Sequence, residues 1–192
     1  MRRTTIFALV GLVAILFALG WQFRFTTFPD SGQQGDSVVP SDTAPRDISA
    51  ADEQSSVAVS AETKDYSSQS YRFALQYPDD LIVTEHDEGD GAASFVFENE
   101  DASRGFQIFV TPYAEATITK ERFAQDQPSG ALNEPVSATV DGAKGMMFYG
   151  SNGDIGDTVE VWFVRGGFLY EAYTYKSDED LLMNVLGTWR FI

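Results

Sequence analysis

The sequence predicts an α+β domain, built on an antiparallel β-sheet of about six to eight strands flanked by helices. Three observations predict this class. After residue 70, apolar and polar residues alternate in several short runs, Gly-containing turns separate these runs, and a helical apolar stripe closes the chain. Before this domain (residues 70–192) we expect a transmembrane anchor or signal segment over residues 1–25 and a disordered acidic linker over residues 26–69.

The composition restricts the functions open to the domain. Cysteine is absent, which excludes disulfides, thiolate metal sites and a cysteine nucleophile. The net charge of the chain is −16, and residues 70–192 carry 8 Lys or Arg against 21 Asp or Glu, a balance of −13. Because such a domain repels phosphate backbones and anionic lipid surfaces, we expect no nucleic-acid binding.

The N-terminus carries a candidate membrane segment. Arg2 and Arg3 precede an apolar run of 16 residues, Ile6–Trp21, which is somewhat shorter than the roughly 20 residues of a spanning helix but can be extended by its neighbours. Positive charge before the run stays in the cytoplasm, so the rest of the chain is expected outside. We interpret the run as a single-pass cell-membrane anchor. Ala18-Leu19-Gly20 leaves open a signal peptide cleaved before Trp21, which would give a secreted domain.

The segment from Pro29 to Gln69 has the composition of a linker. It is rich in Ser, Asp, Ala, Gly and Gln and contains one aromatic residue, Tyr66. Such a segment buries too little apolar surface to offset the entropy lost on ordering. We therefore expect a flexible tether that separates the domain from the bilayer.

The first half of the domain is predicted to form four strands. Residues 71–77 alternate between large apolar and other side chains, the period of a half-buried strand, and Pro78 ends this run. A turn is expected at residues 88–91. Three further strands are expected over residues 81–85, 93–97 and 106–110.

The second half is predicted to contain a short helix and two hairpins. Thr119 is a suitable N-cap for a helix that extends to about Gln125, with Glu121 in its first turn. Asp141-Gly142 and Arg165-Gly166-Gly167 each predict a hairpin turn. The strands joined by these turns are expected over residues 136–140 and 143–149, and over residues 157–164 and 168–175.

A C-terminal helix is expected to cover the sheet. The late strands carry large apolar side chains on both faces, so both faces need cover. Ser177, followed by three acidic residues, predicts the start of a helix. The apolar stripe of this helix consists of Leu181, Leu182, Val185, Leu186 and Trp189.

Two segments resemble a known family. The opening Tyr71-Arg72-Phe73-Ala74-Leu75-Gln76-Tyr77-Pro78 and the ending Trp189-Arg190-Phe191 are similar to those of PsbP-type domains, a superfamily that includes Mog-type Ran-binding proteins and bacterial exported lipoproteins. The resemblance covers roughly residues 69–192 and implies an antiparallel sheet with helices on both faces. It also implies an assembly factor or binding module, but neither photosystem nor Ran partners, and it matches no functional residue.

No catalytic constellation is present in the sequence, and we expect no catalytic residue, cofactor or metal ligand. His86 is the only histidine; it stands beside Asp87, no Gly-x-Ser-x-Gly motif exists, and we interpret it as a solvated loop residue. Calcium binding remains an alternative at three acidic clusters that lack the full EF-hand spacing. These clusters are Asn152 to Asp157; Glu85, Asp87, Glu88 and Asp90; and Glu98, Glu100 and Asp101.

The sequence therefore predicts a membrane-tethered extracytoplasmic binding or assembly module with an unidentified protein partner. Tyr and Trp are enriched at protein interfaces, so aromatic residues on neighbouring strands are the candidate partner-binding residues. The alternatives are a carboxylate-based hydrolase, which requires a cleft with two carboxylates and a raised pKa, and a calcium-stabilised structural module. The candidate aromatic residues are Tyr149, Trp162, Tyr170, Tyr173 and Tyr175.

Overall fold

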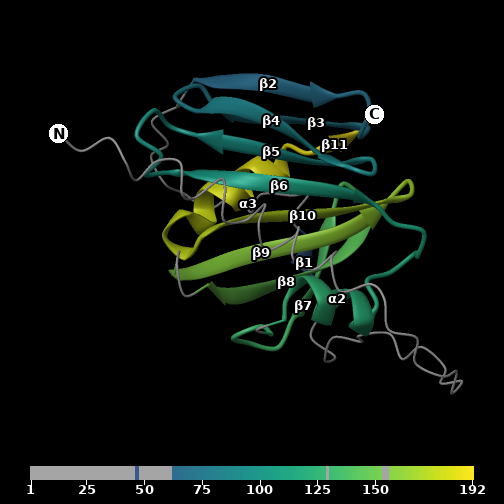
Figure 1. Cartoon of the computed structure of the whole chain (residues 1–192). Helices are drawn as coiled ribbons and strands as arrows, with labels where there is room; N and C mark the ends of the chain where they lie inside the picture. Colours follow the sequence, from purple (N-terminus) through teal and green to yellow (C-terminus); the bar gives the residue numbers. More distant parts are fainter. Residues whose placement is uncertain (1–45, 48–61, 129, 153–155) are drawn as a thin grey trace, which may run out of the picture.

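The computed structural model describes residues 46–47, 62–128, 130–152 and 156–192, and these form two β-sheets and two α-helices. The large sheet has eight strands in the order β1-β7-β8-β9-β10-β6-β5-β4, and the small sheet has the order β11-β3-β2 (Figure 1). Among the described strands, all pairs are antiparallel except β1 with β7. The predicted α+β class, with an antiparallel sheet flanked by helices, is confirmed.

The strands and helices of the two sheets have the following bounds. The large sheet contains β1 (Arg46–Asp47), β4 (Ile82–Gly89), β5 (Ala92–Glu98), β6 (Gly105–Pro112), β7 (Val136–Val140), β8 (Ala143–Asn152), β9 (Gly156–Arg165) and β10 (Phe168–Tyr175). The small sheet contains β2 (Thr63–Ser68), β3 (Phe73–Pro78) and β11 (Arg190–Phe191). The helical elements are α2 (Lys120–Asp126), the 3-10 turn η1 (Lys176–Asp178) and α3 (Glu179–Gly187).

The hairpin-turn signals and the cap of α2 are confirmed, whereas Ser177 lies in η1 and α3 begins at Glu179 without a side-chain cap bond. Asp141 and Gly142 join β7 to β8 with φ angles of 42° and 76°, the left-handed values that a tight hairpin turn requires. Gly166 and Gly167 join β9 to β10. Thr119 caps α2 by accepting a hydrogen bond of 3.1 Å from the backbone N–H of Arg122.

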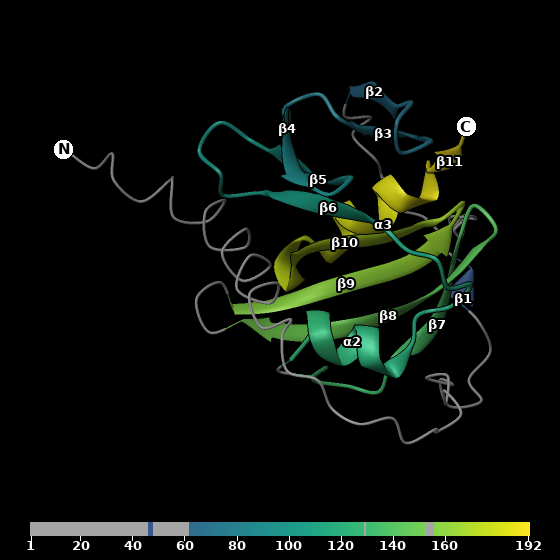
Figure 2. The ribbon, with the colours of Figure 1, turned by 45° about the vertical axis from the view of Figure 1, so that its right-hand side comes forward.

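Helices cover the two faces of the large sheet, as Figures 1 and 2 show. On one face, α3 and the small sheet enclose the main core, where the ring of Phe73 stacks on Trp189 at 4.5 Å. On the other face, Phe123 of α2 packs on Phe148 and Trp162 in a smaller core. The predicted stripe of α3 is buried over Leu181, Leu182, Val185 and Leu186, while Trp189 lies just beyond the end of the helix.

The sheet assignment of the opening strand differs from the prediction. Residues 73–78 form β3, with Phe73, Leu75 and Tyr77 buried as expected, but β3 pairs with β2 and β11 and not with the large sheet. The short strand β11 was not predicted. Periodicity reports which side chains face a core, but it does not report which strand lies alongside.

The predicted linker ends earlier than residue 69. Thr63–Ser68 forms β2, which pairs with β3 over its whole length. Tyr66 explains this extension, because its ring lies within 5.8 Å of the ring centroids of Phe73, Phe95 and Phe97. The rest of the predicted linker, apart from β1, Glu62 and Gln69, lies outside the described residues.

Two further sequence predictions concern β4 and the membrane segment. The strand predicted over residues 81–85 is observed as β4 over Ile82–Gly89, because pairing with β5 continues past Glu85 to a turn at Asp90 and Gly91.

No helix within the described ranges is long and apolar enough to cross a membrane. The predicted anchor Ile6–Trp21 lies outside those ranges.

Candidate functional site

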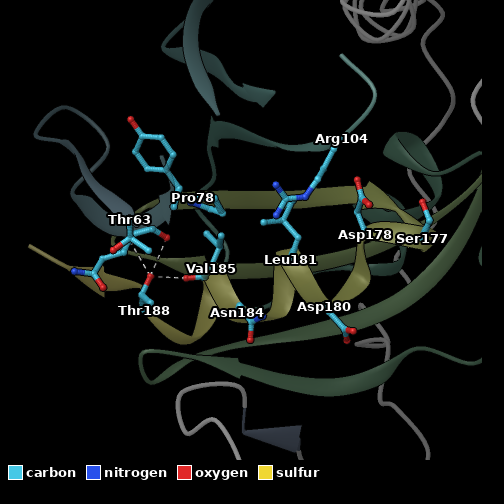
Figure 3. A pocket seen from close by; sticks show the side chains of 12 residues that line it. Thr63, Pro78, Arg104, Ser177, Asp178, Asp180, Leu181, Asn184, Val185 and Thr188 are labelled. Carbon is cyan, nitrogen blue, oxygen red and sulfur yellow. Dashed lines mark hydrogen bonds between the residues drawn. The ribbon is translucent and has the colours of Figure 1, made fainter. Parts of the chain in front are cut away.

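A groove runs along α3, where the helix faces β3 and the turn before β6. It has a volume of about 440 Å³, and we call it the α3 groove (Figure 3). Leu181 and Val185 form its apolar floor and are 8% and 2% exposed. Polar side chains form the rest of the lining. The lining residues are Thr63, Gln76, Tyr77, Pro78, Arg104, Ser177, Asp178, Asp180, Leu181, Asn184, Val185 and Thr188.

Hydrogen bonds fix both ends of the α3 groove. At the C-terminal end of α3, Thr188 Oγ1 accepts a hydrogen bond of 2.8 Å from the backbone N–H of Gln76 in β3. At the other end, the backbone N–H of Gly105 donates to Asp178 Oδ2 over 3.3 Å. Because α3 is bonded to different strands at its two ends, the width of the groove is set by the fold before any ligand arrives.

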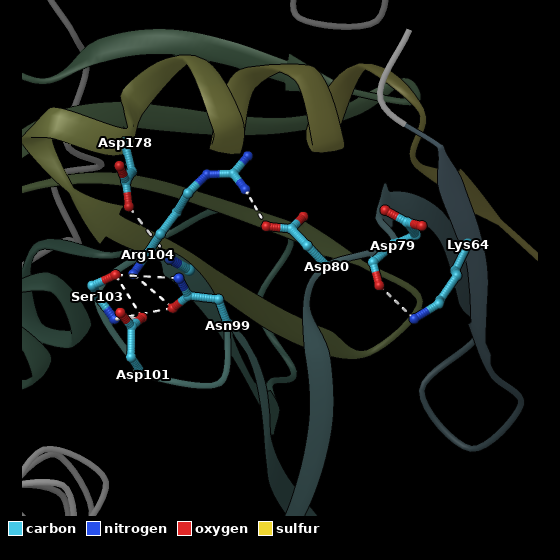
Figure 4. A network of polar contacts seen from close by, with 9 residues as sticks. Lys64, Asp79, Asp80, Asn99, Asp101, Ser103, Arg104 and Asp178 are labelled. Carbon is cyan, nitrogen blue, oxygen red and sulfur yellow. Dashed lines mark hydrogen bonds and ion pairs between the residues drawn. The ribbon is translucent and has the colours of Figure 1, made fainter.

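Arg104 stands on the wall opposite α3, at the end of an ordered turn (Figure 4). Asn99 Oδ1 accepts hydrogen bonds from the backbone N–H groups of Ser103 and Arg104 at 3.0 and 3.1 Å. The guanidinium of Arg104 pairs with Asp80 at 2.9 Å, and these two side chains are 40% and 53% exposed. Such an exposed pair contributes little stability, so the guanidinium can exchange Asp80 for a ligand group.

The sequence did not identify the α3 groove. Asp178 and Asp180 were interpreted only as the acidic start of a helix, which they also are. No local pattern marks Arg104 or Thr188, because their neighbours in the groove come from strands distant in the sequence. Only the acids at the start of α3 could have served as a signal.

The five predicted partner-binding aromatics do not form one surface. Trp162 and Tyr170 are 2% and 1% exposed and lie in the cores on opposite faces of the large sheet. Tyr173 and Tyr175 alternate with Tyr170 along β10 and so face away from it, partly exposed. Tyr149 lies against the main core. Adjacent strands do bring these residues together, but strand alternation divides them between two faces.

Two of these tyrosines have structural hydrogen bonds. The hydroxyl of Tyr170 donates to the backbone oxygen of Tyr71 at 2.8 Å, and burial raises the pKa of Tyr170 to about 12. The hydroxyl of Tyr149 donates to the carboxylate of Glu179, and Lys176 lies 4.5 Å from its ring centroid. These contacts attach β3 and the start of α3 to the large sheet.

A cluster of carboxyl groups lies beneath α2, on the sheet face opposite the α3 groove. Glu171 of β10 is 3% exposed, and its Oε1 atom lies 3.7 Å from Nη2 of Arg122 in α2. Arg122 Nε also forms an ion pair with Asp126, one turn further along α2. The carboxyl groups of Asp126 and Glu171 thus meet at the same guanidinium, and both side chains are 4% exposed. Burial raises the pKa of Glu171 well above its usual range, and the adjacent Asp126 raises it further.

Glu160 of β9 lies beside Asp126 and Glu171 and has hydrogen-bond donors of its own. Its carboxylate accepts hydrogen bonds from Thr158, Trp162 Nε1 and Gln127 Nε2 at 3.1, 3.0 and 3.0 Å. Burial raises the pKa of Glu160, and these three donors oppose the shift. Gly150 is required beside it, because a Cβ atom there would lie 2.5 Å from Glu160 Oε1.

The carboxyl cluster bears on the hydrolase alternative. It contains two adjacent carboxyl groups with raised pKa values, as a carboxylate-based hydrolase requires. However, the side chains of Asp126 and Glu171 are each only 4% exposed, so a substrate cannot reach them while α2 is in place. We therefore do not assign a hydrolytic site to this pair.

The remaining sequence candidates are His86 and the acidic clusters considered for calcium. His86 lies on β4, paired with Ser94, and is half-buried, so the prediction of a solvated loop histidine was wrong. Pairing with β5 extends β4 through this residue. Within the described part of the chain, no group of three or more His, Cys, Asp or Glu side chains could hold a metal ion. Residues 153–155 of the first calcium candidate lie outside that part.

Comparison with known proteins gives matches of structure only. No family model matches the sequence, and no curated protein matches it. A crystal structure of a protein from Bacteroides thetaiotaomicron matches with a TM-score of 0.47 and 18% identity, covering 67% of this chain. The chain spans about half of that protein, 48%.

A second match is the solution structure of cyanobacterial PsbP (CyanoP) from Synechocystis. Its TM-score is 0.49 and its identity 14%, and the match covers 72% of this chain and 97% of that one. The likeness concerns the fold, and no activity or partner follows from it.

Proposed function

We propose that this chain is a membrane-tethered extracytoplasmic binding or assembly module without a catalytic role, and that it binds an extended cationic segment of a partner protein. The observation that carries the proposal is the α3 groove. It combines an apolar floor, polar walls and hydrogen bonds that fix its two ends. Its lining is mostly polar, which suits a ligand held by hydrogen bonds and charge over a small apolar contact.

The size of the α3 groove favours a short segment over a folded surface. A volume of about 440 Å³ accommodates a few side chains. Leu181 and Val185 offer apolar contact, while Asn184, Gln76 and Thr63 offer hydrogen-bonding groups along the same line. An extended peptide can alternate apolar and polar groups along such a groove.

Charge favours a cationic segment. Asp178 and Asp180 lie at one end of the α3 groove, and only Arg104 opposes them among its lining residues. The whole domain adds a balance of −13 over residues 70–192. Lys or Arg groups of a partner would be attracted at long range and then pair with the two aspartates. The same field disfavours nucleic acid.

The position of the module at the membrane is supported by the N-terminal sequence. Arg2 and Arg3 precede the apolar run Ile6–Trp21, and this order predicts that the domain lies outside the cytoplasm. Protease added to intact cells should digest the domain at the outer surface. A domain that resists protease until the membrane is permeabilised would contradict this orientation.

Binding in the α3 groove can be tested with two substitutions and one control. Peptides selected from a random library on the purified chain should be enriched in Lys and Arg and should bind more weakly as salt is raised. Asp180→Lys reverses a charge at the groove, and Asn184→Trp fills it; each should weaken binding at least about tenfold. Glu115→Lys makes the same charge change at an exposed loop residue outside the groove lining and should retain most of the affinity.

Two results would contradict the proposed binding site. Equal losses for Asp180→Lys and Glu115→Lys would show that net charge, and not the α3 groove, attracts the peptides. Unchanged affinity for Asn184→Trp would show that the peptides bind elsewhere. Circular dichroism of each variant checks that the fold is retained.

A further inference from the structure

Helix α2 is attached to the large sheet by few contacts. None of its seven residues is fully buried. Its aromatic contact is Phe123, whose ring centroid lies 5.0 Å from Phe148 and 5.4 Å from Trp162. A helix of this length is not stable by itself in water. The position of α2 therefore depends on the packing of Phe123 and on the polar contacts of Arg122 and Asp126.

The polar contacts beneath α2 place more carboxyl groups around Arg122 than its single positive charge can neutralise. Arg122 and Asp126 approach from α2, Glu171 from β10, and Glu160 from β9. Two tyrosines lie beside these groups. The carboxyl groups of Glu160 and Glu171 contribute to the raised pKa of Tyr173 in β10, and the ring of Tyr113 lies 5.9 Å from the Arg122 guanidinium. One positive charge thus faces two buried carboxyl groups, with the buried Glu160 beside them.

A proton is required to keep this arrangement closed. Asp126 and Glu171 are both buried against the same guanidinium, that of Arg122, so the closed arrangement favours one neutral carboxyl group. Glu171 Oε1 has no hydrogen-bond partner, which is costly for an ionised oxygen in a buried place. With both groups ionised, two adjacent negative charges would share a single guanidinium.

We propose that α2 is a pH-sensitive cover: the singly protonated Asp126–Glu171 pair holds it over Phe148 and Trp162, and loss of the shared proton releases it and uncovers these two rings. The device is independent of the proposed binding function, because its residues lie on the sheet face opposite the α3 groove. Its consequence is a second, aromatic surface that is accessible only at higher pH.

The direction of the pH effect follows from the closed state. Burial raises the pKa of both Asp126 and Glu171 when α2 is in place, while Arg122 opposes the shift. The closed state therefore binds the proton more tightly than the released state does. Closure is favoured at low pH, and it is lost as the pH rises through the raised pKa of the pair.

Hydrogen exchange of the α2 amides in the full chain tests this cover. Intrinsic exchange also accelerates with pH, so the relevant quantity is the ratio of exchange rates between the wild-type chain and Glu171→Gln at each pH. Glutamine keeps the shape of Glu171 and can donate to Asp126, but it does not titrate. The ratio should be near one below the ordinary carboxyl pKa of about 4, rise by up to about tenfold per pH unit between that value and the raised pKa of the pair, and level off above it.

Trp162 supplies a second readout. Release of α2 should increase the quenching of Trp162 fluorescence by acrylamide as the pH rises, and this increase should be absent in Trp162→Phe. Asp126→Asn should suppress the increase as Glu171→Gln does. Glu121→Gln, a change at an exposed residue of the same helix, should leave it intact.

Several outcomes would overturn the proposal. An exchange ratio that stays constant with pH, or a Trp162 signal that does not change, would show that α2 does not open. An equal loss of the pH response in Glu121→Gln would assign it to the charge of the helix and not to the pair. If both variants of the pair fail to fold, the wild-type and Trp162→Phe titrations still decide whether α2 opens.

Discussion

Replacing Tyr66 by alanine should destabilise the domain measurably, although this residue belongs to a segment with the composition of a linker. Its half-buried ring makes edge or tilted contacts with Phe73, Phe95 and Phe97 at centroid distances of 5.8, 5.8 and 5.4 Å. Its hydroxyl donates to Glu85 Oε1 at 2.7 Å. The ring thereby joins β2 and β3 of the small sheet to the large sheet.

The magnitude follows from these contacts. Removing a fully buried aromatic ring costs about 3–5 kcal/mol, and a half-buried ring with three aromatic neighbours should cost about 2–3 kcal/mol. Tyr66→Phe removes only the hydrogen bond to the exposed Glu85 and should cost about 0.5–1 kcal/mol. The ratio of the two losses in unfolding free energy separates the contribution of ring packing from that of the hydroxyl hydrogen bond.

Urea unfolding of the purified chain measures both losses. Tyr66→Ala should lower the midpoint without a large change in the slope, because the unfolding unit stays the same. If Tyr66→Ala and the wild-type chain unfold at the same midpoint, β2 contributes nothing to the domain. The reasoning that extends the domain to Thr63 would then be refuted.

Two other substitutions test local features. Gly145→Ala places a Cβ atom 2.0 Å from the backbone oxygen of Trp162. The substitution should force β8 away from β9 and lower the free energy of unfolding by more than about 2 kcal/mol. The control Gly142→Ala lies in a turn with no neighbour closer than 3.9 Å and should cost about 1 kcal/mol because of its positive φ. Equal urea midpoints for the two variants would contradict the expected clash between β8 and β9. Thr119→Ala removes the N-cap bond to Arg122 and should weaken α2 by about 1 kcal/mol. Faster exchange of the α2 amides would show this, and unchanged exchange would mean that the cap contributes little.

Much of the fold could be predicted because its signals are local. Asp141-Gly142 specifies its hairpin through backbone conformation alone, and Thr119 specifies the start of α2 through one side-chain bond. The alternation in β3 and the apolar stripe of α3 report burial directly. Such features need no knowledge of a distant partner.

The candidate site could not be predicted, because its groups meet only after folding. Arg104 reaches α3 across the fold, and Glu171 meets Asp126 from an element 45 positions away in the numbering. A buried carboxyl such as Glu171 has the same sequence signature as an exposed one. Strand alternation also places Tyr170 and Tyr173 on opposite faces of the sheet, although the sequence analysis assigned both to one candidate binding surface.

The sequence by itself determined most of the elements: an acidic chain without cysteine, short alternating strands, two hairpins, and two helices, one of them with its cap. Only the tertiary structure decided which strands pair, that Tyr66 brings β2 into the domain, and that α3 leaves a groove beside Arg104. The physical reason is the range of the forces involved. Backbone preference and periodicity act over a few residues, whereas pairing, burial and charge clustering depend on neighbours that the chain supplies from far away.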